Sequence, residues 1–283
     1  MHRILTLLDG SAYSESVCHH TAWFARKLGA GVEAMHVLGR REGAASSDLS
    51  GTLRLGARAA LLDELTTLDE QRARLARARG QAILDDARAI LDQAGVPVVN
   101  TRLYKGDLLD AVREVGRGVR GITIGKRGER ADFASGHLGS NLERIVRMSE
   151  VPVFVASREF RPVSKVLLAY DASASAWAAV DRMASSPVFS DLEICVLCAG
   201  PDEALALITA QEGVLALQTA GLSATSRAVV GEPDEVLNRV VTDEGFDLLV
   251  MGAYGHSRIR SLIIGSTTTA MIRSVKIPVL LFR

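Results

Sequence analysis

Glycine and hydroxyl side chains gather in one short segment near the end of the chain, MGAYGHSRIRSLIIGSTTTAMIRS. Gly252 and Gly255 lie near its start, and Gly265 is followed directly by Ser266 and Thr267. Glycine lets a backbone approach a ligand closely, and a helix that begins at Ser266 would direct unpaired N–H groups and hydroxyls at an anion. The segment therefore indicates a phosphate site; the alternative is a plain turn whose serine caps a helix.

The same arrangement occurs earlier in the chain. The matching residues are Gly125, Gly128, Gly139, Ser140 and Asn141. One spacing differs, because nine residues separate Gly255 from Gly265 whereas ten separate Gly128 from Gly139. We therefore expect the later segment to form the better site.

Cationic side chains accompany both segments. Lys126, Arg127 and Arg130 lie in the earlier loop, and Arg258 and Arg260 lie in the later one. Charged donors make short, strong hydrogen bonds to phosphate oxygens. We expect these side chains to be mobile and to attract an anionic ligand.

An aspartate ends the apolar stretch that opens each half of the chain. RILTLLD ends at Asp9, and KVLLAYD ends at Asp171. A carboxylate at a strand end can contact a ligand, or it can cap the helix that follows. The residues themselves leave both interpretations open.

These parallels extend along the whole chain and indicate two copies of one domain, residues 1–159 and 164–283. The motif VPVFV of the first copy matches IPVLL of the second, and KGDLLDAV matches VGEPDEVL. The polar stretch REFRPVSK between the copies is typical of a short linker. The chain therefore contains a tandem repeat.

The first copy carries an insertion at about residues 40–95. Val37 and Val196 are 159 residues apart, whereas Gly106 and Gly231 are 125 apart, so the insertion amounts to about 34 residues. Its leucines recur at helical spacing and predict one long helix or a helical hairpin. We expect this helix, from about Leu55 to Leu91, to project from the first copy and to have no counterpart in the second. The charged middle, DEQRARLARAR, is either a solvated face or part of a helix that binds a partner or dimerises.

Apolar strands and helical segments alternate in each copy, which predicts an α/β fold. We expect strands at about 3–8, 32–37, 98–104, 121–125 and 152–156, and again at 165–170, 192–197, 224–230, 246–251 and 278–282. With right-handed crossovers, each copy forms a doubly wound, open, five-stranded parallel sheet with its ligand site at the carboxyl ends of the strands. The apolar fifth strands must be covered, so we expect the two copies to pack together there.

Composition excludes several classes of protein. The 33 basic residues match the 33 acidic ones, which argues against a general nucleic-acid binder or a membrane-surface protein. No apolar run approaches the roughly 18 residues that cross a bilayer. Cysteine is sparse, with only Cys18, Cys195 and Cys198, which fits a reducing compartment. We expect a cytoplasmic protein without nucleic-acid or membrane partners.

No sequence pattern for catalysis or metal binding emerges. The chain has no G-x-S-x-G elbow, no Walker A loop and no HExxH pair. The C-x-x-C at Cys195 and Cys198 falls on an expected strand, where residues three apart point to opposite faces, so it favours core packing. We identify no catalytic residue and no metal ligand.

The glycine spacing of the later segment, the two strand-end aspartates and the duplication together resemble the universal stress proteins. The resemblance covers essentially the whole chain, twice. It implies sheets in the order 3-2-1-4-5, similar to those of the adenine nucleotide alpha hydrolases. It also implies ATP or a related adenine nucleotide as ligand, with or without Mg²⁺.

The resemblance further assigns roles by position. Asp171 would lie by the ribose, and the backbone of Val196 would bind the adenine. The phosphates would be held by Gly252, Gly255, Gly265, Ser266 and Thr267. The first-copy counterparts are Asp9, Val37, Gly125, Gly128, Gly139, Ser140 and Asn141.

The function predicted in this way is that of a stress-response or regulatory protein in which bound nucleotide stabilises one conformation. One alternative is an enzyme, a slow ATPase or nucleotidyl transferase, on the same site. Another is a scaffold that binds no nucleotide. For partners, we expect an adenine nucleotide and intramolecular pairing of the two domains; a homodimer through the inserted helix is the alternative to a solvated helix face.

Overall fold

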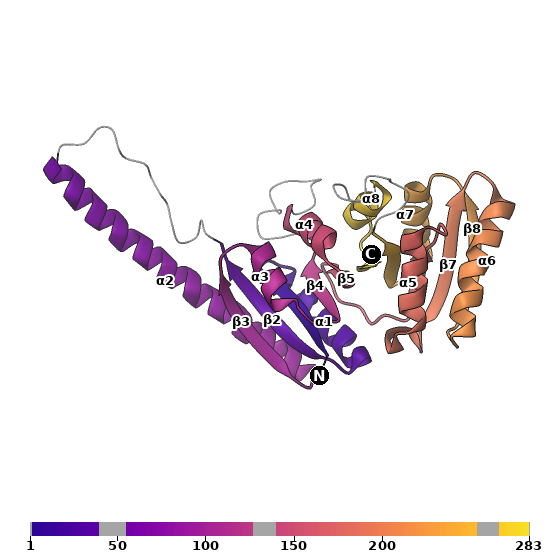
Figure 1. Ribbon diagram of the computed structural model, residues 1–283, viewed down its shortest axis with the longest axis horizontal. Helices are drawn as coiled ribbons and strands as arrows, with labels where there is room; N and C mark the ends of the chain where they lie inside the picture. The colour runs from indigo at the N-terminus through magenta and orange to yellow at the C-terminus, as the bar shows by residue number, and fades with distance from the viewer. Residues whose placement is uncertain (1, 40–54, 127–139, 254–265, 283) are drawn as a thin grey trace.

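The computed structural model describes residues 2–39, 55–126, 140–253 and 266–282 (Figure 1). Predictions for the remaining positions lie outside the described residues.

Within this part of the chain, the strands form one ten-stranded sheet with the order β3-β2-β1-β4-β5-β10-β9-β6-β7-β8. The first half contributes β1 (Arg3–Leu8), β2 (Gly31–Leu38), β3 (Val99–Lys105), β4 (Gly121–Gly125) and β5 (Val153–Ala156). The second half contributes β6 (Lys165–Ala169), β7 (Glu193–Gly200), β8 (Ala224–Val230), β9 (Leu248–Gly252) and β10 (Val279–Phe282). Each half is parallel with the order 3-2-1-4-5, which confirms the predicted fold class.

The two half-sheets join where β5 and β10 pair antiparallel. Val155 pairs with Val279, and Phe154 pairs with Leu280. All four side chains are buried. Each strand would otherwise expose an apolar edge, so the pairing covers both edges and confirms the expected packing of the fifth strands.

Two layers of helices cover the faces of the sheet. One layer contains α1 (Ser14–Leu28), α2 (Leu55–Gln93), α5 (Ala174–Ala184) and α6 (Glu203–Thr219). The other contains α3 (Leu108–Val115), α4 (Ser140–Met148), α7 (Pro233–Asp243) and α8 (Ser266–Ser274). In β6, Val166 and Leu168 join the core under the first layer, and Leu167 joins the core under the second. Burial on both faces explains why the strands are apolar throughout.

The insertion forms one helix rather than a hairpin, since α2 runs unbroken through 39 residues. Its last turns pack on the sheet and bury Leu84, Ala87 and Leu91. Its earlier part projects away from the body of the protein (Figure 1). The projection was predicted from the sequence.

The last part of α2 nevertheless has a counterpart, contrary to expectation. Both α2 and α6 lie between the second and third strands of their halves, and they end alike. The Val96 N–H donates to the carbonyl of Leu91, and the Leu222 N–H donates to the carbonyl of Leu217, at 3.1 and 3.0 Å. Only the portion before about residue 77 is therefore additional to the shared fold.

Among the described residues, no helix combines the length and the apolar character that a membrane crossing requires.

Candidate functional site

The candidate sites lie where strand order reverses, between the first and fourth strands of each half. Leu7 pairs with Ile124, so Asp9 and Gly125 both lie at the carboxyl ends of these neighbouring strands. Ala169 pairs with Met251, which places Asp171 and Gly252 in the same relation in the second half. Doubly wound folds bind ligands at such positions.

Both aspartates make the same local hydrogen bond. Oδ1 of Asp9 accepts from the Ser11 N–H, and Oδ1 of Asp171 accepts from the Ser173 N–H, each at 3.0 Å. This bond holds the turn after the strand rather than the first turn of the helix, because Ser173 itself caps α5 through a bond from the Ala176 N–H at 3.3 Å. The cap interpretation of the aspartates is therefore replaced by a turn-forming one.

The turn after each aspartate is left-handed. Gly10 has φ of 76°, and Ala172 has φ of 55°. This conformation suits glycine and strains an alanine. Alanine at this position in the second half is thus a strained residue next to a predicted ligand-binding aspartate.

The backbone of Val37 points to the predicted ligand side. Along a strand in a parallel sheet, main-chain groups alternate between the two neighbours. Gly31 donates to His2 on the β1 side, and Leu38 accepts from Gly106 on the β3 side. The main-chain groups of Val37 therefore face the β1 side. They lie one residue beyond the end of β1, whose last residue, Leu8, pairs with His36.

Val196 does not fill the same place in the second half, and this prediction is corrected by the register. The Leu197 carbonyl accepts from Tyr170 on the β6 side, whereas the Gly200 carbonyl accepts from Gly231 on the β8 side. By the same alternation Val196 faces β8, and Ala199 faces β6 beyond the end of that strand. Ala199 is thus the counterpart of Val37.

The correction also changes the size of the insertion. Met35 pairs with Leu7, and Leu197 pairs with Ala169, so both members of the pair are displaced by 162 residues between the halves. The insertion is therefore 37 residues (162 minus 125) rather than 34.

Gly252 has a packing reason for being glycine. A Cβ at this position would lie 2.5 Å from Oγ of Ser175 and 2.8 Å from its backbone carbon. On its other side, the Thr268 hydroxyl of α8 donates to the Gly252 carbonyl at 3.3 Å. The end of β9 is therefore held closely between α5 and α8, whatever its role toward a ligand.

Helices α4 and α8 begin at the predicted serines, Ser140 and Ser266. Asn141 is exposed and Thr267 is half-buried. The loop positions Gly128, Gly139, Gly255 and Gly265, and the arginines 127, 130, 258 and 260, lie outside the described residues. Two helix N-termini thus stand after the glycine loops, as an anion site would require.

Lys126 is not mobile, contrary to the expectation from its loop position. Its side chain is buried, and its ammonium donates to the carbonyl of Val275, directly after the last residue of α8. A cation is favourable at the carboxyl end of a helix dipole. Lys126 therefore links the end of β4 in the first half to α8 in the second.

His36 is a site-flanking residue whose contact the sequence did not reveal. Nδ1 of His36 lies 2.8 Å from the carbonyl of Leu8, the residue before Asp9. Helix α2 passes close by, since a Cβ on Gly80 would lie 2.9 Å from the His36 ring. The second-half counterpart at the same displacement is Cys198, which has no such donor.

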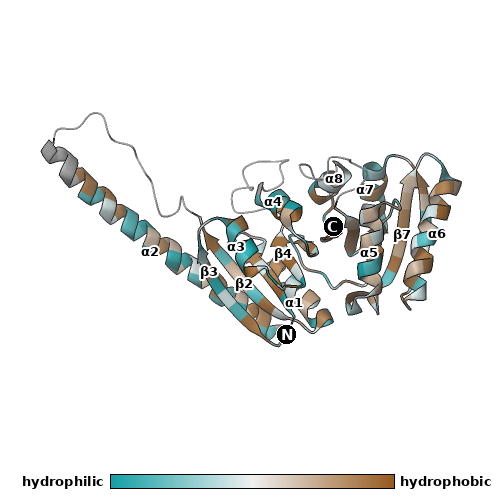
Figure 2. Ribbon diagram, viewed as in Figure 1, coloured by the Kyte–Doolittle hydropathy of each residue, from teal (hydrophilic) through white to brown (hydrophobic). Residues whose placement is uncertain are grey.

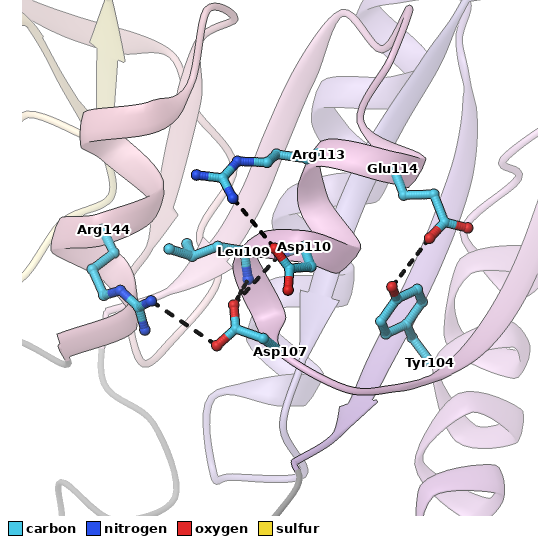
Figure 3. A network of polar contacts seen from close by, with 7 residues as sticks. All are labelled: Tyr104, Asp107, Leu109, Asp110, Arg113, Glu114 and Arg144. Atoms are coloured by element: carbon cyan, nitrogen blue, oxygen red, sulfur yellow. Dashed lines mark hydrogen bonds and ion pairs between the residues drawn. The ribbon is translucent and has the colours of Figure 1, made fainter.

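The neighbouring helix α3 does not offer a free N-terminus (Figure 3). The Asp107 carboxylate accepts from the Leu109 N–H at 2.8 Å and from the Asp110 N–H at 3.4 Å. Arg144 of α4 lies 4.0 Å from the same carboxylate. These contacts tie α3 to α4 at the carboxyl edge of the sheet and place a negative charge where an anion would otherwise bind.

The thiols fit the packing interpretation. Cys195 and Cys198 lie on β7 without a disulfide, and burial raises the pKa of both thiols. Burial likewise raises the pKa of Cys18 to about 12. The described residues contain no cluster of three or more His, Cys, Asp or Glu side chains that could hold a metal ion.

Comparison with known proteins adds to this geometry. The model of the universal stress protein family matches residues 1–157 and 199–283. Universal stress protein Slr1230 of Synechocystis sp. is 38% identical over 289 residues, which cover 100% of both chains.

Two solved structures share the fold over nearly the whole chain. A universal stress protein from Archaeoglobus fulgidus has a TM-score of 0.73 and 20% identity, covering 99% of this chain and 98% of its own. A putative universal stress protein from Pseudomonas aeruginosa has a TM-score of 0.61 and 15% identity, covering 100% and 93%. At these identities the likeness concerns the fold alone.

Proposed function

The chain belongs to the universal stress protein family, and from this premise we propose that it binds ATP or a related adenine nucleotide in its second half. In this proposal the protein acts in stress response or regulation, and the nucleotide shifts it toward one conformation. The proposed domains are residues 1–159 and 164–283.

The observation that carries the proposal is the convergence of three kinds of groups at the end of β6. Asp171 follows the strand, the backbone of Ala199 faces the space beyond it, and α8 begins at Ser266 after the adjacent β9. Carboxylate, main-chain amide and helix N-terminus suit ribose hydroxyls, an adenine edge and phosphates, respectively. This is the ligand that the resemblance to universal stress proteins implies.

Each group has a defined task in this proposal. Asp171 accepts hydrogen bonds from ribose hydroxyls while its Oδ1 keeps the turn bond to Ser173. The main chain of Ala199, rather than that of Val196, binds the adenine. Ser266 and Thr267 add hydroxyl donors to the N–H groups of α8, near the predicted glycine loop. Any accompanying Mg²⁺ would be held mainly by the phosphates, because such sites use few protein ligands.

Binding would be transmitted along α8. Its first turn is joined to β9 by the bond from Thr268 to Gly252, and its carboxyl end is joined to β4 by Lys126. A nucleotide that tightens the start of α8 therefore acts on an element that the first half also holds. This arrangement supports a ligand-linked change rather than a purely local one.

The test is to purify the full chain, denature it, and identify any released nucleotide by absorbance and mass spectrometry, followed by calorimetric titration with ATP. We expect a bound adenine nucleotide or a titratable ATP site. A chain that carries none and shows no heat with millimolar ATP would overturn the proposal. ADP production with Mg²⁺ would instead favour the enzymatic alternative.

A further inference from the structure

Helix α2 lies directly against the end of β2. A Cβ on Gly80 would lie 2.9 Å from the ring of His36 and 3.4 Å from Cδ2 of Leu38. These two residues flank Val37, whose main chain lies where the resemblance to universal stress proteins would place an adenine. The helix and the side chain of Leu38 therefore fill space beside the main-chain groups that an adenine would need.

The same part of α2 reaches the aspartate turn at the end of β1. A Cβ on Gly10 would lie 2.5 Å from Cδ1 of Ile83 and 3.6 Å from Nη2 of Arg79. Apolar and hydrophilic residues are interspersed along α2 (Figure 2), and residues four apart lie on one face of a helix. One helix face thus brings an apolar side chain and a cation to the residue after Asp9, where a ribose would bind.

The second half carries smaller side chains at the matching helix positions. Equivalent hydrogen bonds to the carbonyls of Leu91 and Leu217 end the two helices, so α6 matches α2 at a displacement of 126 residues (217 minus 91). The Thr209 hydroxyl, at the position of Ile83, donates to the Leu205 carbonyl at 2.9 Å and is therefore turned toward its own helix. The counterparts of Arg79, Gly80 and Ile83 are Leu205, Ala206 and Thr209.

The end of β7 is open where the end of β2 is filled. Gly200 is the counterpart of Leu38, because their carbonyls accept hydrogen bonds from the equivalent residues Gly231 and Gly106. A Cβ on Gly200 would have no atom of the described residues within 4 Å. The strand-end space beside Asp171 therefore has room at a position where the first half places a leucine.

We propose that Leu38, Arg79 and Ile83 close the first strand-end site, so that the chain binds a single adenine nucleotide, in its second half. This inference rests on the proposed function and names the residues that limit its stoichiometry. The two apolar side chains occupy volume that adenine and ribose would need, and closely packed atoms are displaced only with loss of their contacts. The guanidinium supplies hydrogen-bond donors beside Asp9, in place of the ribose hydroxyls.

The first experiment gives the first half the residues of the second, as Leu38→Gly/Arg79→Leu/Ile83→Thr in the full-length chain. Calorimetric titration should show a single ATP site in the wild type and a second ATP bound per chain in this variant. Arg77→Leu/Gln81→Thr is the matched control, because both residues are exposed and lie on the opposite side of α2. The control should keep the wild-type stoichiometry. Circular dichroism and thermal unfolding check that each chain folds.

The second experiment makes the reverse exchange in the second half, as Gly200→Leu/Leu205→Arg/Thr209→Ile. This variant should bind ATP at least about tenfold more weakly, because the open strand end is now filled. Its control is Leu207→Arg, an exposed position on the opposite side of α6, which should bind ATP as the wild type does. If the first-half variant does not fold, this exchange decides the matter, and unchanged ATP affinity would overturn the inference.

The outcomes separate the inference from the proposed function. Two ATP molecules bound by the wild type, or one bound by a folded first-half variant, would overturn the inference and leave nucleotide binding intact. Adding Asp9→Ala to the first-half variant should remove the gained site, and a second ATP that persists would show binding elsewhere, contrary to the inference. If no chain bound ATP, the proposed function would be wrong and the inference with it.

Discussion

The two halves of the chain end their first strands with the same aspartate turn and then surround that turn differently. In the first half, Gly10 lies under α2, and a Cβ there would lie 2.5 Å from Cδ1 of Ile83. In the second half, Ala172 takes the same left-handed turn with φ of 55°. Helix α6 replaces α2 there and does not extend beyond the shared fold.

The ends of β2 and β4 also make contacts that their counterparts in the second half, β7 and β9, lack. His36 contacts the last carbonyl of β1, and Lys126 extends from β4 to the end of α8. Their second-half counterparts are Cys198 and Ala253, whose side chains carry no charge-bearing donor. The first half thus uses its strand ends for contacts within the protein. This contrast favours the second half as the nucleotide site and the first as the structural half.

The largest difference between the two halves is expected from substitutions in the glycine loops, whose residues lie outside the described part of the chain. Gly265→Val should lower ATP affinity by about a hundredfold or more, because a β-branched side chain blocks backbone approach and resists positive φ. Gly139→Val should have a smaller effect. Equilibrium titration with a fluorescent ATP analogue compares the two. If only Gly139→Val lost ATP affinity, the nucleotide site would lie in the first half and the proposal would be wrong.

A second contrast concerns acid stability, since buried His20 on α1 corresponds to the exposed Arg182 on α5. Burial lowers the pKa of His20 to about 4 from its ordinary 6.5. Between these values the unfolded chain binds the proton and the folded one does not, so stability falls as pH falls. From pH 7 to pH 4 this group should cost about 3 kcal/mol of unfolding free energy.

Urea unfolding at the two pH values measures this loss. His20→Gln keeps a donor near the Ser16 carbonyl but cannot titrate. The unfolding free energy that this variant loses between pH 7 and pH 4 should therefore be smaller than the wild-type loss by about 3 kcal/mol. Equal losses in variant and wild type would locate the acid sensitivity elsewhere.

A third contrast is the hydrogen bond from Lys126 in the first half to Val275 in the second, which Ala253, the counterpart of Lys126, cannot make. Lys126→Met should destabilise the protein by about 1.5–3 kcal/mol, because it leaves the buried Val275 carbonyl without its charged donor. Chemical unfolding monitored by circular dichroism gives the value. Methionine has a length and volume similar to those of lysine, so the change reports mainly the lost charged donor. An unaltered midpoint in Lys126→Met would remove the proposed link between the halves.

The smallest effects are expected at the two left-handed turns. Ala172→Gly should stabilise the protein by about 0.5–1 kcal/mol by relieving strain, net of the added freedom of the unfolded chain. The reverse change in the first half, Gly10→Ala, should destabilise it by about 1–3 kcal/mol, since it adds both strain and the contact with Ile83. Thermal unfolding compares them, and a stabilising Gly10→Ala would show that the turns are not equivalent.

Much of the fold could be predicted because it is encoded in repeated local patterns. Apolar strands, glycine loops and the helix starts at Ser140 and Ser266 recur in both halves. The apolar fifth strands also required a cover, which led to the pairing of β5 with β10. Strand order followed from the resemblance to universal stress proteins.

The errors arose where a long-range contact decides the outcome. Val196 and Val37 both precede a leucine, but the hydrogen bonds of Leu197 and Gly200 to different neighbouring strands set the register three residues later. The partner of Lys126 lies 149 residues further along the chain, so no local pattern could reveal it. The reason for glycine at position 252 is the approach of Ser175 on another element.

Calorimetric titration of ATP into Asp171→Ala and Asp9→Ala most directly tests the claim that the second half holds the nucleotide site. The variants are matched, since each loses the same 3.0 Å turn bond. We predict that Asp171→Ala loses affinity by about tenfold to a hundredfold, the loss of a hydrogen bond to a charged group, while Asp9→Ala binds as the wild type does. Retained affinity in Asp171→Ala together with loss in Asp9→Ala would contradict it.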